Sequence, residues 1–252
     1  MRKKKEKIEN NNNIAVSVKD LHISYRGLSK TSIRAAWTKK KKKVEVFEAL
    51  KGVSFEIEEG KILGIIGKNG SGKSTMLRAI AGIFSADKGS IDLHGHTISL
   101  LSIGVGFNKK LTGYENIYLS GMLLGFSEEE IKEKEKEIIE FADIGSFMFK
   151  PVKTYSSGMY SKLAFAITAI LETDIMLIDE VLSVGDTQFK EKSYNKMKEL
   201  INDDKRTVII VSHSLGTIKE LCNQVLWIND GEMMMIGTPE EVLPKYDEFM
   251  KS

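Results

Sequence analysis

The stretch that decides the fold of this 252-residue chain is GKNGSGKST, which runs from Gly67 to Thr75. It fits the pattern G-x-x-x-x-G-K-[S/T], a glycine-rich loop whose backbone N–H groups wrap around the phosphates of a nucleotide. Gly70 and Gly72 give the backbone the freedom that such a wrap requires. An apolar run, KILGIIG, precedes the loop, and a helical pattern, STMLRAIAGIF, follows it. A buried strand, this loop and a helix, in that order, predict a binding site for a nucleoside triphosphate.

The side chains and backbone of this loop suit the charge of a triphosphate. We expect Lys73 to reach the β- and γ-phosphates and the hydroxyl of Ser74 to ligate Mg²⁺. The helix that follows turns its positive N-terminal end toward the phosphates. The predicted nucleotide-binding residues of the loop are Gly67, Lys68, Asn69, Gly70, Ser71, Gly72, Lys73, Ser74 and Thr75.

Two further strand ends carry candidate catalytic residues. In DIMLIDE, four apolar residues place Asp179 at the carboxyl end of a buried strand, where doubly wound sheets bind their ligands. We expect Asp179 to hold Mg²⁺ and Glu180 to orient and polarise the attacking water. His213, just past the strand in VIIVSHS, is expected to bond the γ-phosphate and sense its presence. Together with Lys73, Glu180 and His213 form the predicted catalytic set.

The order of the remaining patterns predicts a mainly parallel sheet, because strand-like runs alternate with helical ones. IAVSV and LHISY are predicted to be two short strands, and VEVFEALKGVSFEI a strand pair. Residues 113–172 have little strand signal and predict an inserted helical subdomain, in which Ser127 and Glu130 form a capping box. VLWINDGEMMMIG predicts a hairpin whose three methionines pack rather than bind metal, and Thr238 and Pro239 start a last helix.

Composition indicates a protein of a reducing compartment. Cys222 is the single cysteine, which excludes an internal disulfide, and the apolar runs are too short to cross a bilayer. Residues 1–13 are charged and rich in asparagine, and we expect them to be disordered and not a secretory signal. A net charge of +2 gives no argument for nucleic acid. The basic run Lys39–Lys43 has two open interpretations, a solvated loop or a contact with an anionic membrane surface.

The ordered set GKNGSGKST, YSSGM, IMLIDE, SVGD and VSHS resembles the nucleotide-binding subunit of ATP-binding-cassette (ABC) transporters across nearly the whole chain. The resemblance implies an ABC-type P-loop NTPase spanning residues 14–252, an α/β fold with a mainly parallel sheet core, an antiparallel β portion near the N-terminus and the helical insertion. It also implies a head-to-tail homodimer that sandwiches two ATP molecules and two Mg²⁺ ions. Each ATP then lies between one copy's phosphate loop and the other copy's signature. By position, the implied contacts outside the phosphate loop are Ser156, Ser157, Gly158, Asp186 and Tyr25, with Phe47 as a weaker aromatic candidate for the adenine.

Two departures from the family pattern affect the expected activity. In YSSGM, Ser157 replaces the first glycine of the signature and Met159 the glutamine, while Ser156 or Ser157 can also act as a plain helix cap. The glutamine that the family places near position 102 is missing, and Ser102 or a neighbour stands there. A serine is shorter, so we expect its Mg²⁺ contact to need a water and hydrolysis to be slow or dependent on the membrane partner.

The motifs YSSGM, LTGYENI and DEVLSVGD resemble those of exporters of lipid-linked cell-surface polysaccharides. KPVKTYSSGM and EEVLPKYDEFM are most similar to the ATP-binding subunit of the Gram-positive teichoic acid exporter. This resemblance implies an integral membrane permease of the ABC-2 exporter type, a lipid-linked polymer as its cargo, and a location at the cytoplasmic face of the cell membrane. Since the sequence ends at Ser252, we expect the polymer to be recognised elsewhere in the exporter.

Three alternatives stay open at this point. The first is an exporter of another polysaccharide, such as O-antigen or capsule. The second is a soluble ABC ATPase that acts on ribosomes or DNA, although one phosphate loop and the lack of a long heptad run count against it. The third is a nucleotide-binding regulator without turnover, which the presence of both Glu180 and His213 disfavours.

Overall fold

The computed structural model describes residues 13–26, 46–101, 106–179, 186–201 and 206–251. Its centre is a six-stranded sheet in the order β5-β6-β7-β3-β8-β9, in which all neighbouring strands are parallel except β8 and β9. This arrangement confirms the predicted mainly parallel core. The strands of this sheet are β3 (Ile62–Ile66), β5 (Ile98–Leu101), β6 (Ile175–Asp179), β7 (Thr207–Val211), β8 (Gln224–Asn229) and β9 (Glu232–Gly237).

The central strands are apolar on both faces because both faces are covered. In β3, Leu63 and Ile65 pack into one cluster with α1 (Lys73–Ile80), whereas Ile66 belongs to a second cluster on the other face. That second cluster contains residues of α4 (Ser157–Ile170), α5 (Thr187–Ile201), α6 (Leu215–Leu221) and α7 (Pro239–Lys251). The period of two along each strand therefore sorts its side chains into two hydrophobic cores.

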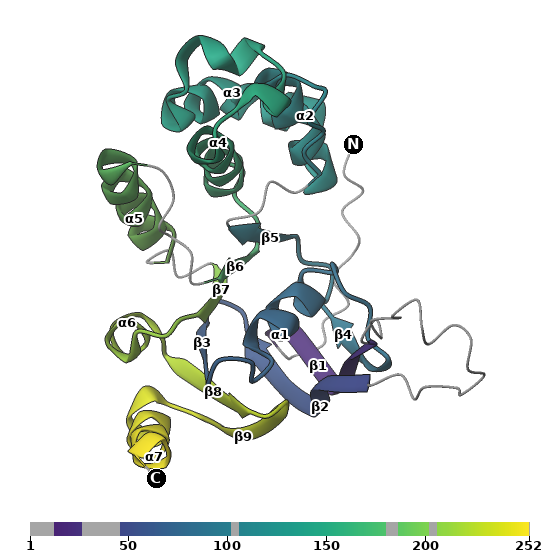
Figure 1. The fold of residues 1–252 in the computed structure, drawn as a ribbon, viewed down its shortest axis with the longest axis vertical. Helices are drawn as coiled ribbons and strands as arrows, with labels where there is room; N and C mark the ends of the chain where they lie inside the picture. Colours follow the sequence, from purple (N-terminus) through teal and green to yellow (C-terminus); the bar gives the residue numbers. More distant parts are fainter. Residues whose placement is uncertain (1–12, 27–45, 102–105, 180–185, 202–205, 252) are drawn as a thin grey trace, which may run out of the picture.

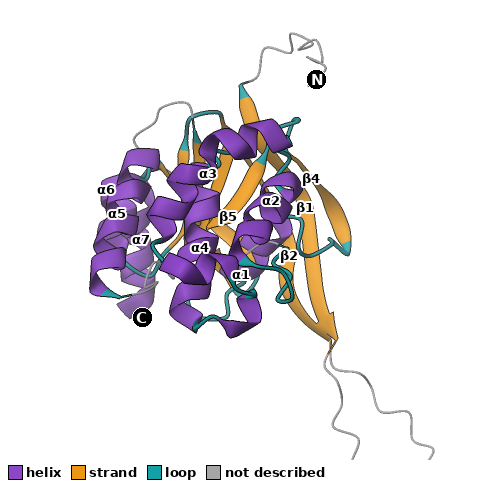
Figure 2. Ribbon diagram, turned by 90° about the horizontal axis from the view of Figure 1, so that it is seen from above, coloured by secondary structure: helices purple, strands orange, loops and turns teal. Residues whose placement is uncertain are grey.

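A separate three-stranded antiparallel sheet, in the order β2-β1-β4, stands on the side of the molecule away from α5, α6 and α7 (Figure 2). The predicted pairs of short strands are wrong in detail, because β1 (Ile14–Arg26) and β2 (Val46–Glu58) are each one continuous strand. Asp20 in β1 and Gly52 in β2 have positive φ angles of 46° and 85°, so each strand bends through an irregularity without ending. The polar strand β4 (Lys88–Asp92) was not predicted, since KGSID lacks an apolar alternation.

The helices α2 (Gly113–Leu123), α3 (Glu128–Ala142) and α4 lie together at one end of the molecule, between β5 and β6 in the sequence (Figure 1). The two short 3-10 segments η2 (Gly145–Phe149) and η3 (Val152–Thr154) connect α3 to α4. The predicted capping box is confirmed, because the Ser127 hydroxyl accepts the Glu130 N–H at 3.2 Å and the Glu130 carboxylate accepts the Ser127 N–H at 2.8 Å. None of the helices in the described part is both long and apolar enough to cross a bilayer.

The C-terminal hairpin β8–β9 forms as predicted, with Asp230 and Gly231 at φ angles of 48° and 83° in the turn. Pro239 begins α7, and the Thr238 N–H donates to the Glu241 carboxylate at 2.9 Å. The prediction that all three methionines pack is wrong for two of them. Met233 and Met234 are exposed on β9, the last strand of the sheet, and only the third methionine packs against the core.

Candidate functional site: a phosphate loop and a separate helix N-terminus

Two glycines of the loop between β3 and α1 leave no room for a side chain. A Cβ atom on Gly67 would lie 2.1 Å from the Ile228 carbonyl oxygen, and one on Gly72 would lie 2.5 Å from the Ala49 carbonyl oxygen. Gly70 and Gly72 also have φ angles of 80° and 107°, which disfavour any residue with a side chain. The backbone is thus packed tightly at Gly67 and Gly72 and open at Gly70, and its positive φ angles are those of a loop that can wrap around phosphates.

Lys73 is buried in this loop and folds back onto it. Its Nζ donates to the carbonyl oxygens of Gly67 and Lys68 at 2.8 and 2.9 Å. The ammonium group is therefore held at the N-terminus of α1, where the helix ends in exposed N–H groups and favours an anion. Next to it, the Ser71 hydroxyl is buried and has no hydrogen-bond partner among the described residues. A buried hydroxyl of this kind fits a ligand that brings its own polar atoms.

The β8–β9 turn supports the loop from behind, a contact that the sequence did not predict. The Gly231 N–H donates to the Ser71 carbonyl oxygen at 3.0 Å, and the Gly231 carbonyl oxygen accepts the Lys51 N–H at 2.9 Å. Asn-Asp-Gly was recognised as a turn, but a turn motif carries no information about which loop it will touch. The phosphate loop is consequently fixed by the antiparallel sheet and the C-terminal hairpin together.

The predicted catalytic residues lie at the same edge of the sheet as the loop. Asp179 ends β6, His213 follows β7, and Gly67 follows β3, and these three strands are adjacent and parallel. Asp179 is partly buried, whereas His213 is exposed. Glu180 and Ser102 lie outside the described residues, as do Lys39–Lys43. The sheet order therefore gathers Asp179, His213 and the phosphate loop at one edge.

Tyr25 lies at the end of β1 beside the first turn of α1. Its hydroxyl is 3.0 Å from the Thr75 hydroxyl, and its ring packs edge-on against Phe84 with centroids 5.8 Å apart. Phe47 is opposite Tyr25 in the β1–β2 register and is 60% exposed. Tyr25 and Phe47 thus lie side by side on β1 and β2, and Tyr25 contacts the first turn of α1.

The N-terminus of α4 is a second, separate element of the predicted site. Ser156 caps the helix, and its hydroxyl accepts the Met159 N–H at 3.2 Å, so the cap is Ser156 and not Ser157. Ser156 and Ser157 are exposed, and a Cβ on Gly158 would meet only the Ser156 hydroxyl, at 3.9 Å. This helix end is open toward solvent, with the first N–H groups of a 14-residue helix directed outward.

Asp186 ties the start of α5 to α4 within one chain. One carboxylate oxygen accepts the Phe189 N–H at 2.9 Å, and the other pairs with Lys162 Nζ at 2.7 Å. The hydrogen bond from Lys162 lowers the pKa of the Asp186 carboxyl, and the bond from the Phe189 N–H adds to this effect. Lys162 lies one and a half turns after the N-terminus of α4, and its role was not apparent from the sequence because it is 24 positions from Asp186 in the chain.

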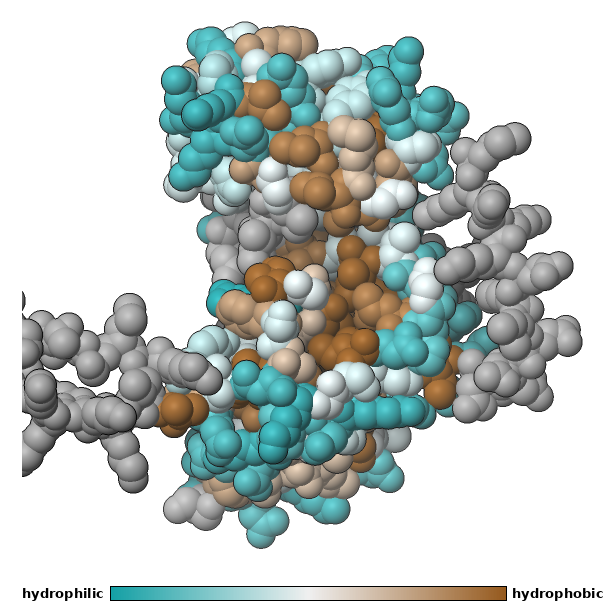
Figure 3. All heavy atoms as spheres, turned by 90° about the vertical axis from the view of Figure 1, so that its right-hand side faces the viewer, coloured by the Kyte–Doolittle hydropathy of each residue, from teal (hydrophilic) through white to brown (hydrophobic). Residues whose placement is uncertain are grey.

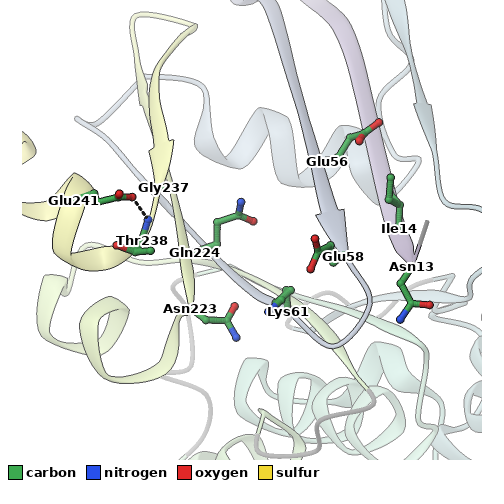
Figure 4. A pocket seen from close by; sticks show the side chains of 10 residues that line it. All are labelled: Asn13, Ile14, Glu56, Glu58, Lys61, Asn223, Gln224, Gly237, Thr238 and Glu241. Carbon is green, nitrogen blue, oxygen red and sulfur yellow. Dashed lines mark hydrogen bonds between the residues drawn. The ribbon is translucent and has the colours of Figure 1, made fainter. Parts of the chain in front are cut away.

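A cavity of about 750 Å³ lies at the opposite edge of the sheet and contains none of the predicted residues (Figure 4). Lys61, which precedes β3, and Gln224, which begins β8, mark this as the amino-terminal edge. Three of its side chains, Glu56, Glu58 and Glu241, are carboxylates, which disfavour a nucleotide. The cavity is therefore not the nucleotide site.

Comparison with known proteins decides the family. The family model described as "ABC transporter" matches residues 50–183, which include the phosphate loop, the α4 N-terminus and Asp179. The chain belongs to the ABC transporter family. Its fold is that of an ABC cassette, since it superposes on the ATP-binding cassette MJ0796, solved as a dimer in a post-hydrolysis state with ADP and Pi, with a TM-score of 0.68. That match covers 89% of this chain and 98% of the other at 22% identity.

Curated relatives of this ABC cassette include export proteins. TagH of Bacillus anthracis, a teichoic acids export ATP-binding protein, is 48% identical over 82% of this chain and 37% of its own length. TagH of Staphylococcus epidermidis is 41% identical over 95% of this chain and 90% of its own length. RfbB of Myxococcus xanthus, an O-antigen export system ATP-binding protein, is 38% identical over 93% of this chain and 56% of its own length. The ABC cassette thus spans from about a third to nine tenths of these relatives.

Proposed function

We propose that this chain is the ATP-hydrolysing subunit of an ABC exporter that moves lipid-linked teichoic acid, or a related cell-surface polysaccharide, across the cytoplasmic membrane. The observation that carries the ATPase part is Lys73, buried and held on the loop's own carbonyl oxygens at the N-terminus of α1. The choice of cargo is supported by the 48% and 41% identity to teichoic acids export proteins.

The substrate is ATP, and each residue of the loop has a distinct task. Lys73 exchanges its contacts with the Gly67 and Lys68 carbonyl oxygens for the β- and γ-phosphates, so its positive charge stays compensated in both states. Backbone N–H groups of the loop and of the first turn of α1 donate to the remaining phosphate oxygens. The Ser71 hydroxyl gains the partner that it lacks within the described chain.

Hydrolysis then depends on the neighbouring strand ends. Glu180 accepts a proton from the attacking water, and His213 donates a hydrogen bond to the γ-phosphate. A hydroxyl and a carboxylate, from Ser74 and Asp179, are oxygen ligands of the kind that Mg²⁺ takes beside the phosphates of a nucleotide. Ser74 and Asp179 would hold this ion, which supplies charge neutralisation on the phosphates.

A second copy of the chain completes the site. The α4 N-terminus carries the Ser156 hydroxyl and outward N–H groups, but it belongs to the helices at the far end of the molecule (Figure 1). In a head-to-tail dimer, Ser156 and Gly158 of one copy close over the γ-phosphate held by the other copy. Closure on ATP and opening after hydrolysis are the motions passed to the permease.

A membrane partner of the ABC-2 permease type accounts for the apolar surface of one face. Figure 3 shows apolar side chains gathered in the hollow between the helical end of the molecule and the sheet. Met122 and Leu123 at the end of α2, and Ile83 after α1, are among the exposed large apolar residues. Binding to a permease places the chain at the cytoplasmic face of the membrane.

Purification of the tagged chain from membranes of its native cells tests the proposal. We expect a polytopic membrane protein to co-purify, and depletion of the chain to make lipid-linked teichoic acid accumulate inside the cell. Accumulation of O-antigen or capsule precursors would favour the second candidate, which the 38% identity to RfbB supports. Co-purification of ribosomes or nucleic acid without a membrane protein would contradict an exporter.

A further inference from the structure

The last helix of the chain touches the phosphate loop directly. Nζ of Lys68 lies 4.5 Å from the centroid of the Phe249 ring, within the range of a cation–π interaction. Lys68 is the second residue of the loop, and Phe249 lies in the last turn of α7. The Phe249 ring is partly buried, so the contact is partly shielded from solvent. Residues 181 positions apart in the sequence are thus joined at the point where the nucleotide is expected.

A second link connects α7 to the strand that leads into the loop. Phe249 packs edge-on against Trp227 with ring centroids 5.0 Å apart, and Tyr246 packs on the same indole at 5.5 Å. Trp227 is paired with Ile66 in the parallel β3–β8 ladder, and Ile66 directly precedes Gly67. Helix α7 therefore contacts Lys68, which directly follows Gly67, and Trp227, the β8 partner of the residue that directly precedes Gly67.

The main chain of Lys68 is central to the loop's arrangement. Its carbonyl oxygen accepts the Lys73 Nζ–H at 2.9 Å and the Ser71 N–H at 3.2 Å. A side chain fixed on the Phe249 ring limits the rotation of this peptide group. The anchor at Phe249 thus pre-orders the segment that Lys73 must leave when it binds phosphates.

We propose that Phe249 is a positioning residue for ATP binding, acting through Lys68. The proposal rests on the proposed ATPase function and adds to it a contribution from the C-terminal helix. Pre-ordering lowers the entropy cost of wrapping the loop around phosphates, so its loss weakens ATP binding and leaves the chemical step unchanged. A partly exposed cation–π contact corresponds to about a two- to fivefold change in affinity.

The test is the steady-state ATPase activity of the full chain, in the assembly in which it turns over, with three variants. Phe249→Leu removes the ring and keeps apolar bulk, and we expect KM for ATP to rise about two- to fivefold with kcat unchanged. Phe249→Tyr keeps the ring face and should restore the wild-type KM. Met250→Ala is the matched control, because Met250 neighbours Phe249 and is 48% exposed, and it should change neither parameter.

A double-mutant cycle separates positioning from general packing. If Phe249 acts through Lys68, the effects of Phe249→Leu and Lys68→Met on KM are not additive. The KM of the double variant is then no higher than that of Lys68→Met alone. Additive effects, an unchanged KM in Phe249→Leu, or a fall in kcat alone would overturn the proposal. Should Phe249→Leu fail to fold, variants of Lys68 test the same contact. Lys68→Arg keeps a cation on the Phe249 ring and Lys68→Met does not. Equal KM values for these two variants would contradict the proposal.

Direct binding of a fluorescent ATP analogue separates a failure of the proposed ATP-binding function from a failure of the role of Phe249. If Lys73→Ala and the wild type bind the analogue equally well, the proposed function of the loop is wrong. If Lys73→Ala loses binding while Phe249→Leu binds like the wild type, only the role of Phe249 is wrong.

Discussion

The phosphate loop and the N-terminus of α4 both suit an anion, but the loop has many more supporting contacts from its own chain. Several segments of the same chain support the loop: Ala49 and Ile228 pack against its glycines, Gly231 donates to it, and Lys73 lies buried within it. The α4 N-terminus has one cap, the Ser156 hydroxyl, and otherwise faces solvent. The loop is therefore held in shape by its own chain, whereas the proposed role of the α4 N-terminus requires a second copy.

This difference explains why each region tolerates different changes. A side chain at Gly67 or Gly72 meets backbone atoms at 2.1 or 2.5 Å, so the loop responds to these substitutions through steric strain. A side chain added at Gly158 meets only the Ser156 hydroxyl, at 3.9 Å, and in the proposed dimer a substitution there acts through the nucleotide of the second copy. The loop should therefore control ATP binding in a single chain, while the α4 N-terminus should control assembly.

The largest effect is expected from Lys73→Ala. The variant loses the ammonium group that the loop buries for the phosphates, and ATPase activity should fall by at least about 10²–10³-fold. The measurement is the steady-state rate of phosphate release, with Lys61→Ala at the opposite edge of the sheet as a charge-matched control. If the ATPase rate of Lys73→Ala stayed within threefold of the wild-type rate, the assignment of the loop as the ATP-binding site would be wrong.

A smaller effect is expected from the aromatic ring beside the loop. Tyr25→Ala should raise KM for ATP by about fivefold or more, because stacking of a base on an aromatic ring contributes about 1–3 kcal/mol. Tyr25→Phe, which loses only the contact with the Thr75 hydroxyl, should stay near the wild-type value. Phe47→Ala compares the two rings directly. If it raises KM more than Tyr25→Ala does, Phe47 and not Tyr25 stacks on the adenine.

The smallest effect is expected from Asp186→Asn, which removes the ion pair between Asp186 and Lys162 of α4. The folded-state pKa of Asp186 is lowered by Lys162, so the ion pair stabilises the protein above the ordinary aspartate pKa, and this contribution is lost as pH falls through the lowered value. Asp186→Asn should lower Tm by about 1–3 °C at pH 7, and the difference should vanish in acid. Thermal unfolding at several pH values measures it. A difference that persists at low pH would mean that the loss comes from the cap on Phe189 and not from charge.

The sequence predicted the loop more fully than its surroundings. Gly67 to Thr75 form a contiguous motif next to a strand and a helix, and Asp179 and His213 follow clear apolar strands, so local patterns were enough to place them at one edge of the sheet. The contacts of Gly231 with Ser71 and of Phe249 with Lys68 join distant segments, and no local pattern encodes which segments will meet.

The features of the fold that the sequence predicted wrongly or missed also depend on contacts between distant segments. VEVFEALKGVSFEI was predicted to be a strand pair, but Gly52 in β2 and Asp20 in β1 both have positive φ angles, and these irregularities let both strands continue. The polar strand β4 forms because β1 offers it an edge, not because its own residues favour a strand. Met233 and Met234 are exposed because β9 is the last strand of its sheet, which depends on the topology and not on the residues.

The most direct test of the proposed role of the α4 N-terminus is the ATP-dependent dimer. Glu180→Gln should bind ATP with Mg²⁺, hydrolyse it very poorly and elute as a dimer in size-exclusion chromatography with light scattering. Adding Ser156→Glu places a negative charge against the partner's γ-phosphate, so the double variant should stay monomeric in ATP while it binds a fluorescent ATP analogue as tightly as Glu180→Gln does. A double variant that still dimerises with ATP would contradict the claim that the α4 N-terminus of one copy completes the phosphate loop of another.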